Sequence, residues 1–302
     1  MKASKRFLII IYLFFLFVGI TTGCLGEHKS DVVKSQDSFK NTFPAVVKIQ
    51  GKAFNIPTSS YFVDFISRTA PTYNRDLINN SVNVSHYNTK FKQAVNIGVY
   101  SIDLSYVSYY DQFSDGGDLF SAIKILALNQ DVGSVSDAFL LSRIEQNREN
   151  RDSLTVIFSQ VFTTLDDYLL RNSREDVSAL IVAGAWVESL YLLVEMDNAS
   201  DTLGLKSVIA DQKYPLENII RLLKPFYPDS SSDQVAFIDS LLDLALLYDG
   251  VVYDYKFIPP STDENSQLTV INCKNSVVIN EYQINQIKSQ IRNIRQHITK
   301  ID

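Results

Sequence analysis

The chain is poor in the residues that build metal sites and covalent cross-links. It has two cysteines and three histidines in 302 residues. His28, His86 and His297 are far apart in the sequence, so no pair has metal-ligand spacing. The chain also lacks a Gly-x-Ser-x-Gly elbow, a phosphate-binding glycine-rich loop and a dinucleotide fingerprint. These absences predict no metal and no cofactor, and they argue against the enzyme classes that such motifs mark.

Positive charge is also scarce. Lysine and arginine total 28 against 34 aspartates and glutamates, which gives a net charge of −6. An acidic protein binds the phosphate backbone of nucleic acids poorly, so we expect no nucleic-acid partner. The chain is long enough for one large core or two modest ones, and 46% of its residues are hydrophobic, which is consistent with such a core.

The N-terminus has the features of a lipoprotein signal peptide. Three basic residues in the first six positions precede Phe7–Ile20, an apolar segment of 14 residues without a charge. This segment is too short for a comfortable membrane-spanning helix. It is followed by Thr21-Thr22-Gly23-Cys24, where small residues lead into a thiol. The pattern predicts cleavage before Cys24 and attachment of acyl chains, palmitate among them, to that residue.

Lipidation at Cys24 would make this cysteine the first residue of the mature protein and attach the protein to a membrane. The chain from Cys24 to Asp302 has 279 residues and a net charge of −9, because three basic residues leave with the signal peptide. Only Cys273 would remain as a thiol, so no intrachain disulfide is expected. Two or three acyl chains hold a protein stably on a bilayer. The alternatives are an ordinary secretory signal or an uncleaved N-terminal helix, with Cys24 unmodified.

The residue after the cysteine bears on location. Leu25, rather than aspartate, follows Cys24. By resemblance to bacterial lipoproteins in general, this favours the outer membrane over retention at the inner membrane. We therefore expect an outer-membrane lipoprotein of the cell envelope that faces either the periplasm or the cell surface.

Composition and periodicity divide the chain into three regions. Residues 1–23 are the expected signal peptide, residues 24–55 are polar with little periodicity and predict a flexible tether, and residues 56–302 predict a single helical domain. No repeat of fixed period occurs, which argues against a regular solenoid. The predicted fold is mainly all-α, an irregular multi-helix bundle of antiparallel helical hairpins.

The last fifth of the chain differs from the rest. β-branched and aromatic residues are concentrated in Val251–Ile258, Leu268–Ile271 and Val277–Ile279, which predicts a small β-hairpin at about 251–280, with Asn272–Asn275 at its turn. The isoleucines of the final segment recur at helical spacing and predict a closing helix over about Glu281–Ile298.

Several helix boundaries are marked by residue type. Asn88 or Thr89 can cap a long helix, and Ser114–Gly117 is expected to end it. A helix start is also expected at Pro57, and Pro215 suits the first turn of a further helix. Ser230–Ser232 is expected to cap the helix that runs to about Tyr248.

Two acidic residues lie inside otherwise apolar helical segments. Asp103 has a tyrosine three residues away on either side, and Glu188 lies between a tryptophan and a tyrosine. A buried carboxylate must be hydrogen-bonded or paired. The candidate ligand-binding residues are therefore Tyr100, Asp103, Tyr106, Trp186, Glu188 and Tyr191.

These residues allow more than one interpretation. Asp103 and Glu188 could meet across a helix interface and form a polar and aromatic pocket for a small polar ligand or a sugar. Alternatively, each acid accepts hydrogen bonds from tyrosine or serine hydroxyls and fixes helix register, or faces solvent. A pair of carboxyl groups could also hydrolyse a glycosidic bond, but sequence spacing does not give the separation that this mechanism needs. Cys273, alone in a predicted turn, is interpreted as inert.

The segment Asn96–Tyr106, read together with the signal sequence before Cys24, resembles a set of uncharacterised helical lipoproteins from Bacteroidota. The resemblance implies an envelope location and an all-helical domain, and it brings no assigned activity. Glycan-binding lipoproteins of the starch-utilisation type are usually longer, and their recognisable segments are missing. The Gly-x-His-x-x-Glu signature of imelysin-type proteins is missing as well.

The sequence thus predicts a lipid-anchored envelope protein that acts as a non-catalytic ligand-binding or assembly module. Its expected partners are the membrane, through the N-terminal lipid, and a small polar ligand or an envelope protein. The alternative is a carboxylate-dependent hydrolase that acts on envelope polymers or glycans through Asp103 and Glu188.

Overall fold

The computed structural model describes part of the chain. The described residues are 45–49, 52–56, 72–131, single positions between 143 and 160, 168–200, 205–263, 268–271 and 273–301. The chain divides into two units, Met1–Thr42 and Phe43–Asp302, and every described element belongs to the second. The expected signal peptide, the lipidation site, the helix expected from Pro57 and most of residues 132–167 lie outside the described residues.

Helices dominate the described residues. The α-helices are α3 (Lys90–Tyr109), α4 (Phe113–Asn129), α7 (Glu175–Ser200), α8 (Leu205–Ala210), α9 (Lys213–Leu223), α10 (Ser232–Tyr248) and α11 (Glu281–Thr299). The 3₁₀ helices are η2 (Arg75–Leu77), η3 (Ser81–His86) and η5 (Lys224–Asp229). The predicted fold class is confirmed, since the protein is mostly helical with a small antiparallel β region and a closing C-terminal helix.

The strands form three antiparallel pairs. They are β1 (Ala45–Ile49) with β2 (Lys52–Ile56), β3 (Val252–Lys256) with β6 (Lys274–Val278), and β4 (Ser261–Asp263) with β5 (Leu268–Val270). Each pair is a separate two-stranded sheet.

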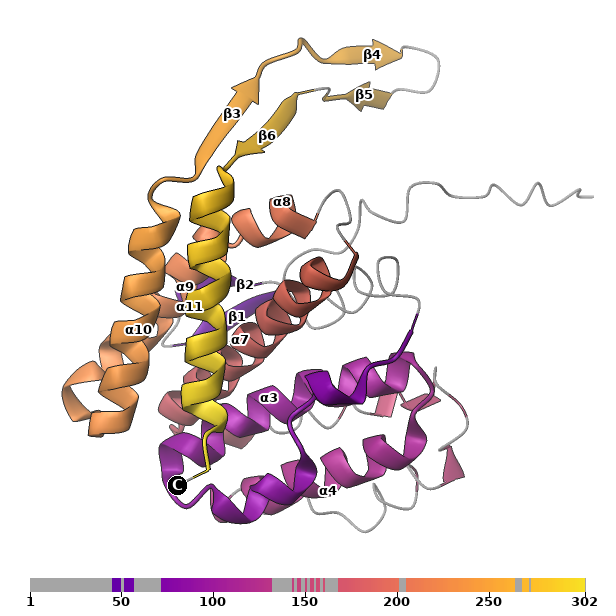
Figure 1. Ribbon diagram of the computed structural model, residues 1–302, viewed down its shortest axis with the longest axis vertical. Coiled ribbons are helices and arrows are strands. Elements are labelled where there is room, and N and C mark those ends of the chain that lie inside the picture. The colour runs from indigo at the N-terminus through magenta and orange to yellow at the C-terminus, as the bar shows by residue number, and fades with distance from the viewer. Residues whose placement is uncertain are drawn as a thin grey trace, which may run out of the picture. The chain divides into compact units, whose positions relative to one another are not determined.

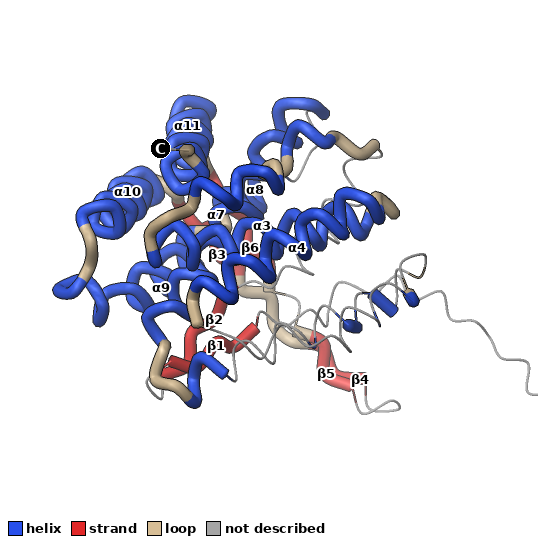
Figure 2. The backbone as a smooth tube through the Cα atoms, turned by 90° about the horizontal axis from the view of Figure 1, so that it is seen from below, coloured by secondary structure: helices blue, strands red, loops and turns tan. Residues whose placement is uncertain are grey.

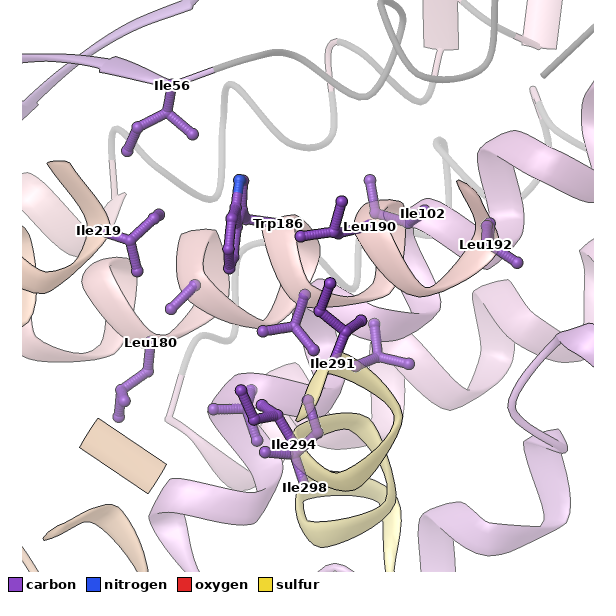
Figure 3. Packing of buried hydrophobic residues seen from close by; sticks show 14 of the residues in the cluster. Ile56, Ile102, Leu180, Trp186, Leu190, Leu192, Ile219, Ile291, Ile294 and Ile298 are labelled. Atoms are coloured by element: carbon purple, nitrogen blue, oxygen red, sulfur yellow. The ribbon is translucent and has the colours of Figure 1, made fainter. Parts of the chain in front are cut away.

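The core is built around α3 and α7, which pack against each other, while α4 covers α3 and α11 contacts both α7 and α3 (Figure 1). Figure 3 shows this core, where Trp186 and Leu190 of α7 and Ile291 and Ile294 of α11 are buried. Helix α3 buries residues on all sides, because other elements surround it.

Several predicted helix starts are confirmed. The Thr89 side chain accepts a hydrogen bond from the backbone N–H of Lys92 at 3.1 Å and caps α3. Ser231 caps α10 by accepting from the backbone N–H of Gln234 at 3.3 Å. Pro215 lies in the first turn of α9, where a missing N–H costs no helical hydrogen bond.

The predicted end of the first long helix was wrong. Ser114–Gly117 lies inside α4, and the chain turns earlier, at Asp111, whose φ of 56° is left-handed. Asp115 falls in the first turn of α4, where the helix dipole favours negative charge. Gly116 is buried against Leu104 of α3, so tertiary packing offsets the low helix propensity of the glycine pair.

The predicted tether was too long at its C-terminal end. β1 and β2 lie within the expected 24–55 segment, and β2 contacts α9. Phe54 and Ile56 are buried, on the same face of β2. This period-two pattern was hidden by the polar residues around it.

The predicted hairpin exists, but its turn was misplaced. β3 pairs with β6 and β4 with β5, so the strands are joined between Asp263 and Leu268 rather than at Asn272–Asn275. Pairing of Val252 with Val278 and of Tyr253 with Val277 sets this register. The four strands form a ribbon that extends away from the helices (Figures 1 and 2).

One helix in the described part of the chain is long and apolar enough to cross a membrane. It is α7, where Glu175–Met196 has a mean hydropathy of 1.9 and 78% of the apolar window is buried inside the protein. We interpret α7 as the central core helix, because its apolar side chains contact the surrounding helices.

Candidate functional site

Three ionisable residues from three helices meet inside the core. Asp103 of α3 and Glu188 of α7 are fully buried, and Arg295 of α11 reaches Glu188. Arg295 Nε donates to Glu188 Oε2 at 3.1 Å and Nη2 donates to Oε1 at 3.2 Å. The guanidinium also lies 4.5 Å from the ring centroid of Tyr191. Two parallel hydrogen bonds and a cation–π contact thus hold the Glu188 carboxylate and its partner in one geometry.

Asp103 is the member of this group without a full set of partners. Its Oδ2 accepts a hydrogen bond from the backbone N–H of Asn79 at 2.9 Å, whereas its Oδ1 has no hydrogen-bond partner. Burial raises the pKa of Asp103 well above its usual range, and the charge of Glu188 raises it further against the opposing effect of Arg295. We therefore infer that Asp103 carries a proton, which a second carboxyl beside it can accept as a hydrogen bond.

A close crossing of α3 and α7 brings the two acids together. A Cβ at Gly98 would lie 2.1 Å from the backbone oxygen of Ile181, and one at Gly184 would lie 2.1 Å from that of Val95. Only glycine allows the two backbones to approach so closely. Asp103 comes five residues after its glycine and Glu188 comes four residues after its own, so both carboxyl groups lie one turn beyond the crossing.

The C-terminal end of α11 is hydrogen-bonded to Tyr87 and to the start of α3, and these bonds hold Arg295 in position. Lys92 Nζ donates to the carbonyl of His297, and Asn96 Nδ2 donates to that of Ile298 at 2.8 Å. The Tyr87 hydroxyl donates to the carbonyl of Thr299 at 3.2 Å. The last carbonyls of a helix lack helical partners and attract positive charge, so these contacts stabilise the end of α11.

The buried group also holds a surface segment, Asn74–Asn80, by its backbone. Asp103 accepts from the N–H of Asn79, and Arg295 Nη2 donates to the carbonyl of Leu77 at 3.4 Å. Two side chains from different helices therefore bind nearby peptide groups of this segment. We call this residue range the 74–80 segment.

Two tyrosines of α3 hold the ends of the same segment. The Tyr100 hydroxyl donates to the carbonyl of Asn80 at 2.9 Å, and the Tyr106 hydroxyl accepts from the N–H of Asn74 at 3.0 Å. Burial raises the pKa of both phenols, so both hydroxyls stay protonated. Asp103 lies between them on α3, and this explains the spacing that the sequence displays.

A polar cavity lies between the 74–80 segment and the first turns of α4. It has a volume of about 410 Å³ and is lined by Arg75, Asp76, Ile78, Asn80, Ser81, Asp115, Asp118 and Leu119. Asp115 is largely buried, where it pairs with Arg75 at 3.0 Å and accepts from the Tyr73 hydroxyl at 2.7 Å. We call this cavity the acidic pocket, because three carboxyl groups and one guanidinium line it.

A second cavity, of about 370 Å³, lies between η3 and the ends of α3 and α4. Its lining is Val84, Ser85, Tyr87, Asn88, Lys90, Gln93, Ile125 and Asn129. Neither Asp103 nor Glu188 lines either cavity. In the described residues, no three His, Cys, Asp or Glu side chains form a group that could hold a metal ion.

The structure separates the six residues that the sequence singled out. Five of them either belong to the buried group or form hydrogen bonds with the backbone of the 74–80 segment. Trp186 does not, since its Nε1 donates to Gln212 Oε1 at 3.2 Å on a different side of α7. The shared pocket between the two acids remains a prediction, and the two cavities described above are lined by other residues.

Sequence reasoning missed Arg295 and the residues of the acidic pocket. A signal for the arginine existed, because Arg295 comes four residues after Ile291 and three before Ile298, which places it on the apolar stripe. Lys288, one heptad earlier, is also buried, at 5% exposed. The pocket had no comparable signal, because its residues come from an irregular segment and the start of α4.

Comparison with protein-family models, with curated proteins and with solved structures finds no match. The geometry defines a class, a helical protein with a buried carboxyl, carboxylate and guanidinium group that supports a polar surface pocket.

Replacing Asp103 by asparagine should change the pH dependence of stability. The folded-state pKa of Asp103 is raised above its unfolded value of about 3.9, so the folded protein holds this proton at a pH where the unfolded chain has released it. The folded protein therefore loses stability as the pH rises from the unfolded pKa to the folded pKa. Relative to the wild type, Asp103→Asn should gain up to about 1.4 kcal/mol per pH unit above pH 4. Urea denaturation of both proteins between pH 4 and 8 measures this, and a pH-independent difference would show that Asp103 is ionised in the folded protein.

Proposed function

We propose that this protein is a lipid-anchored envelope protein that binds a small polar ligand in the acidic pocket without chemical conversion. The observation that carries the proposal is the attachment of the pocket wall to the core. Four side chains of the core bind the backbone of the 74–80 segment, so the pocket is preorganised. A preorganised polar cavity loses less entropy on binding than a loop that must order first.

The lining indicates the chemistry of the ligand. Asp76 and Asp118 are exposed, while Asp115 already pairs with Arg75. Carboxylates accept hydrogen bonds and donate none, so the two exposed acids favour a ligand with hydroxyl or amino groups. An amino sugar of the cell envelope has both.

The buried acids support binding rather than hydrolysis. Asp103 and Glu188 have no exposed surface, and Glu188 is occupied by two hydrogen bonds from Arg295. A general acid or base must reach the bond that it cleaves. The hydrolase alternative would require the core to open, and the roles of both residues in holding the 74–80 segment account for them without catalysis.

Glucosamine is a suitable first probe of the acidic pocket. We expect saturable binding to the wild type by calorimetry, weakened about tenfold or more in Asp76→Asn/Asp118→Asn, because each lost charge-assisted hydrogen bond contributes about 1.5–3 kcal/mol. The matched control is Asp229→Asn/Asp243→Asn, which removes two exposed acids outside the pocket. Equal affinity in the pocket variant and the control would place the ligand elsewhere.

The lipid anchor has its own test. Cys24→Ala should abolish incorporation of labelled palmitate and move the protein from the membrane fraction to the soluble fraction, since the acyl chains supply the stable attachment. The matched control is Cys273→Ala, which removes the other thiol. Palmitate labelling that persists in Cys24→Ala, or membrane attachment without any label in the wild type, would contradict the proposed anchor.

A further inference from the structure

The ribbon of β3, β4, β5 and β6 concentrates exposed apolar side chains. We call the described residues of the range Val252–Val278 the apolar ribbon. Among the described residues, 17 large hydrophobic side chains are exposed, and seven of them lie in the 22 residues of this ribbon. Phe257 is 64% exposed, Leu268 is 59% exposed and Ile271 is 75% exposed. Concentrations of this kind on a protein surface mark a contact with another apolar phase or protein.

The base of the apolar ribbon is attached to the helices. The Tyr253 hydroxyl donates to the carbonyl of Ala210 at 3.2 Å, and its ring lies 5.3 Å from that of Tyr214. Further along, every described residue of β5 is exposed, and Figures 1 and 2 show β4 and β5 reaching away from the helices. A two-stranded ribbon is marginally stable in water by itself, so a covering surface would stabilise this part.

The chain before β1 indicates which surface is within reach. Twenty residues separate Cys24 from Ala45, the first residue of β1. Fully extended they span at most about 70 Å, so an anchor at Cys24 keeps the folded unit close to the bilayer. A tether of this length raises the local concentration of membrane at the apolar ribbon far above that of a free partner.

The charge and residue types of the apolar ribbon also suit a bilayer. It contains two acidic and two basic residues, a net charge of zero in a mature chain of −9. A nearly neutral surface is not repelled by zwitterionic headgroups. Tyr255 and Phe257 are exposed aromatic residues of the kind that is enriched at membrane interfaces.

We propose that the apolar ribbon lies in the headgroup region of the bilayer that carries the Cys24 lipid, as a second contact that orients the helical unit. The proposal rests on the proposed lipid anchor. A second copy of the chain, pairing through its own ribbon, is the competing occupant.

The only thiol besides Cys24 lies in the apolar ribbon, so it can carry a probe. The acylated protein is reconstituted into phosphatidylcholine vesicles, labelled at Cys273 with an environment-sensitive fluorophore, and challenged with spin-labelled phosphatidylcholine. We expect quenching by the spin label in the wild type and loss of most of it in Phe257→Ser/Ile271→Ser. The matched control, Val82→Ser/Leu246→Ser, removes two apolar side chains that are each 68% exposed on other elements, and it should keep the quenching.

The outcomes separate the inference from the anchor on which it rests. The mass of the N-terminal peptide reports acylation of Cys24, and an unmodified Cys24 refutes the proposed anchor. On the acylated protein, absent quenching, or equal quenching in the ribbon variant, overturns the proposed bilayer contact. A dimer in light scattering that the ribbon variant abolishes, without quenching in the wild type, also overturns it and assigns the surface to a second copy.

Discussion

Gly98→Ala and Gly184→Ala should each lower the free energy of unfolding by about 3 kcal/mol or more. An added Cβ would lie 2.1 Å from a backbone oxygen of the facing helix in both cases. Backbone cannot rotate away as a flexible side chain can, so α3 and α7 must separate and lose packing along the central interface. Urea denaturation followed by circular dichroism measures the change.

Gly117→Ala is the matched control for this prediction. A Cβ at Gly117 meets nothing within 4 Å, and the residue lies inside α4. The substitution should raise stability by about 0.5–1 kcal/mol, because alanine restricts the unfolded chain and favours the helix. If Gly98→Ala behaved like Gly117→Ala, α3 and α7 would not cross in close contact.

Arg295→Met should destabilise the protein by about 3–5 kcal/mol, the range for breaking one partner of a buried ion pair. Glu188 would keep its charge without its guanidinium partner, fully buried and beside Asp103. The 74–80 segment would lose the hydrogen bond to Leu77, so glucosamine binding in the acidic pocket should weaken as well. Equilibrium unfolding and calorimetry on one preparation measure both effects.

Two further variants test the physical reason. Arg295→Met/Glu188→Gln should recover much of the lost stability, because the second change removes the unpaired charge. Arg292→Met, which breaks the partly exposed pair with Glu195, should cost no more than about 1 kcal/mol. Equal losses in Arg292→Met and Arg295→Met, or no recovery in the double variant, would contradict a buried charge at Glu188.

The importance of Asp103 and Glu188 could be predicted because an acid inside an apolar helix requires a partner. The identity of that partner could not be predicted from the sequence. Arg295 is 107 residues from Glu188, and only the packing of α11 against α7 and α3 brings them together. The role of Tyr100 and Tyr106 depended in the same way on a distant segment, since their hydroxyls bind backbone groups of Asn74 and Asn80.

The errors have a related cause. The glycine pair at 116–117 has low helix propensity, and local reasoning placed the helix end there, but contact with α3 keeps Gly116 in α4. The strand β2 is short and its alternation of apolar and polar residues is weak. Its burial depends on contact with α9. In the apolar ribbon the strand pairing is non-local, so the residues of the turn could not be read from composition.

The sequence by itself determined the features that depend on local chemistry. Apolar periodicity specified the helices, Thr89 and Ser231 specified two starts, and the scarcity of cysteine leaves stability to the core. Tertiary structure alone decided which side chains meet, that is the glycine crossing, the pairing of Glu188 with Arg295 and the acidic pocket. The physical reason is that periodicity and capping act within a turn or two of chain, whereas pairing and cavities depend on how whole helices pack.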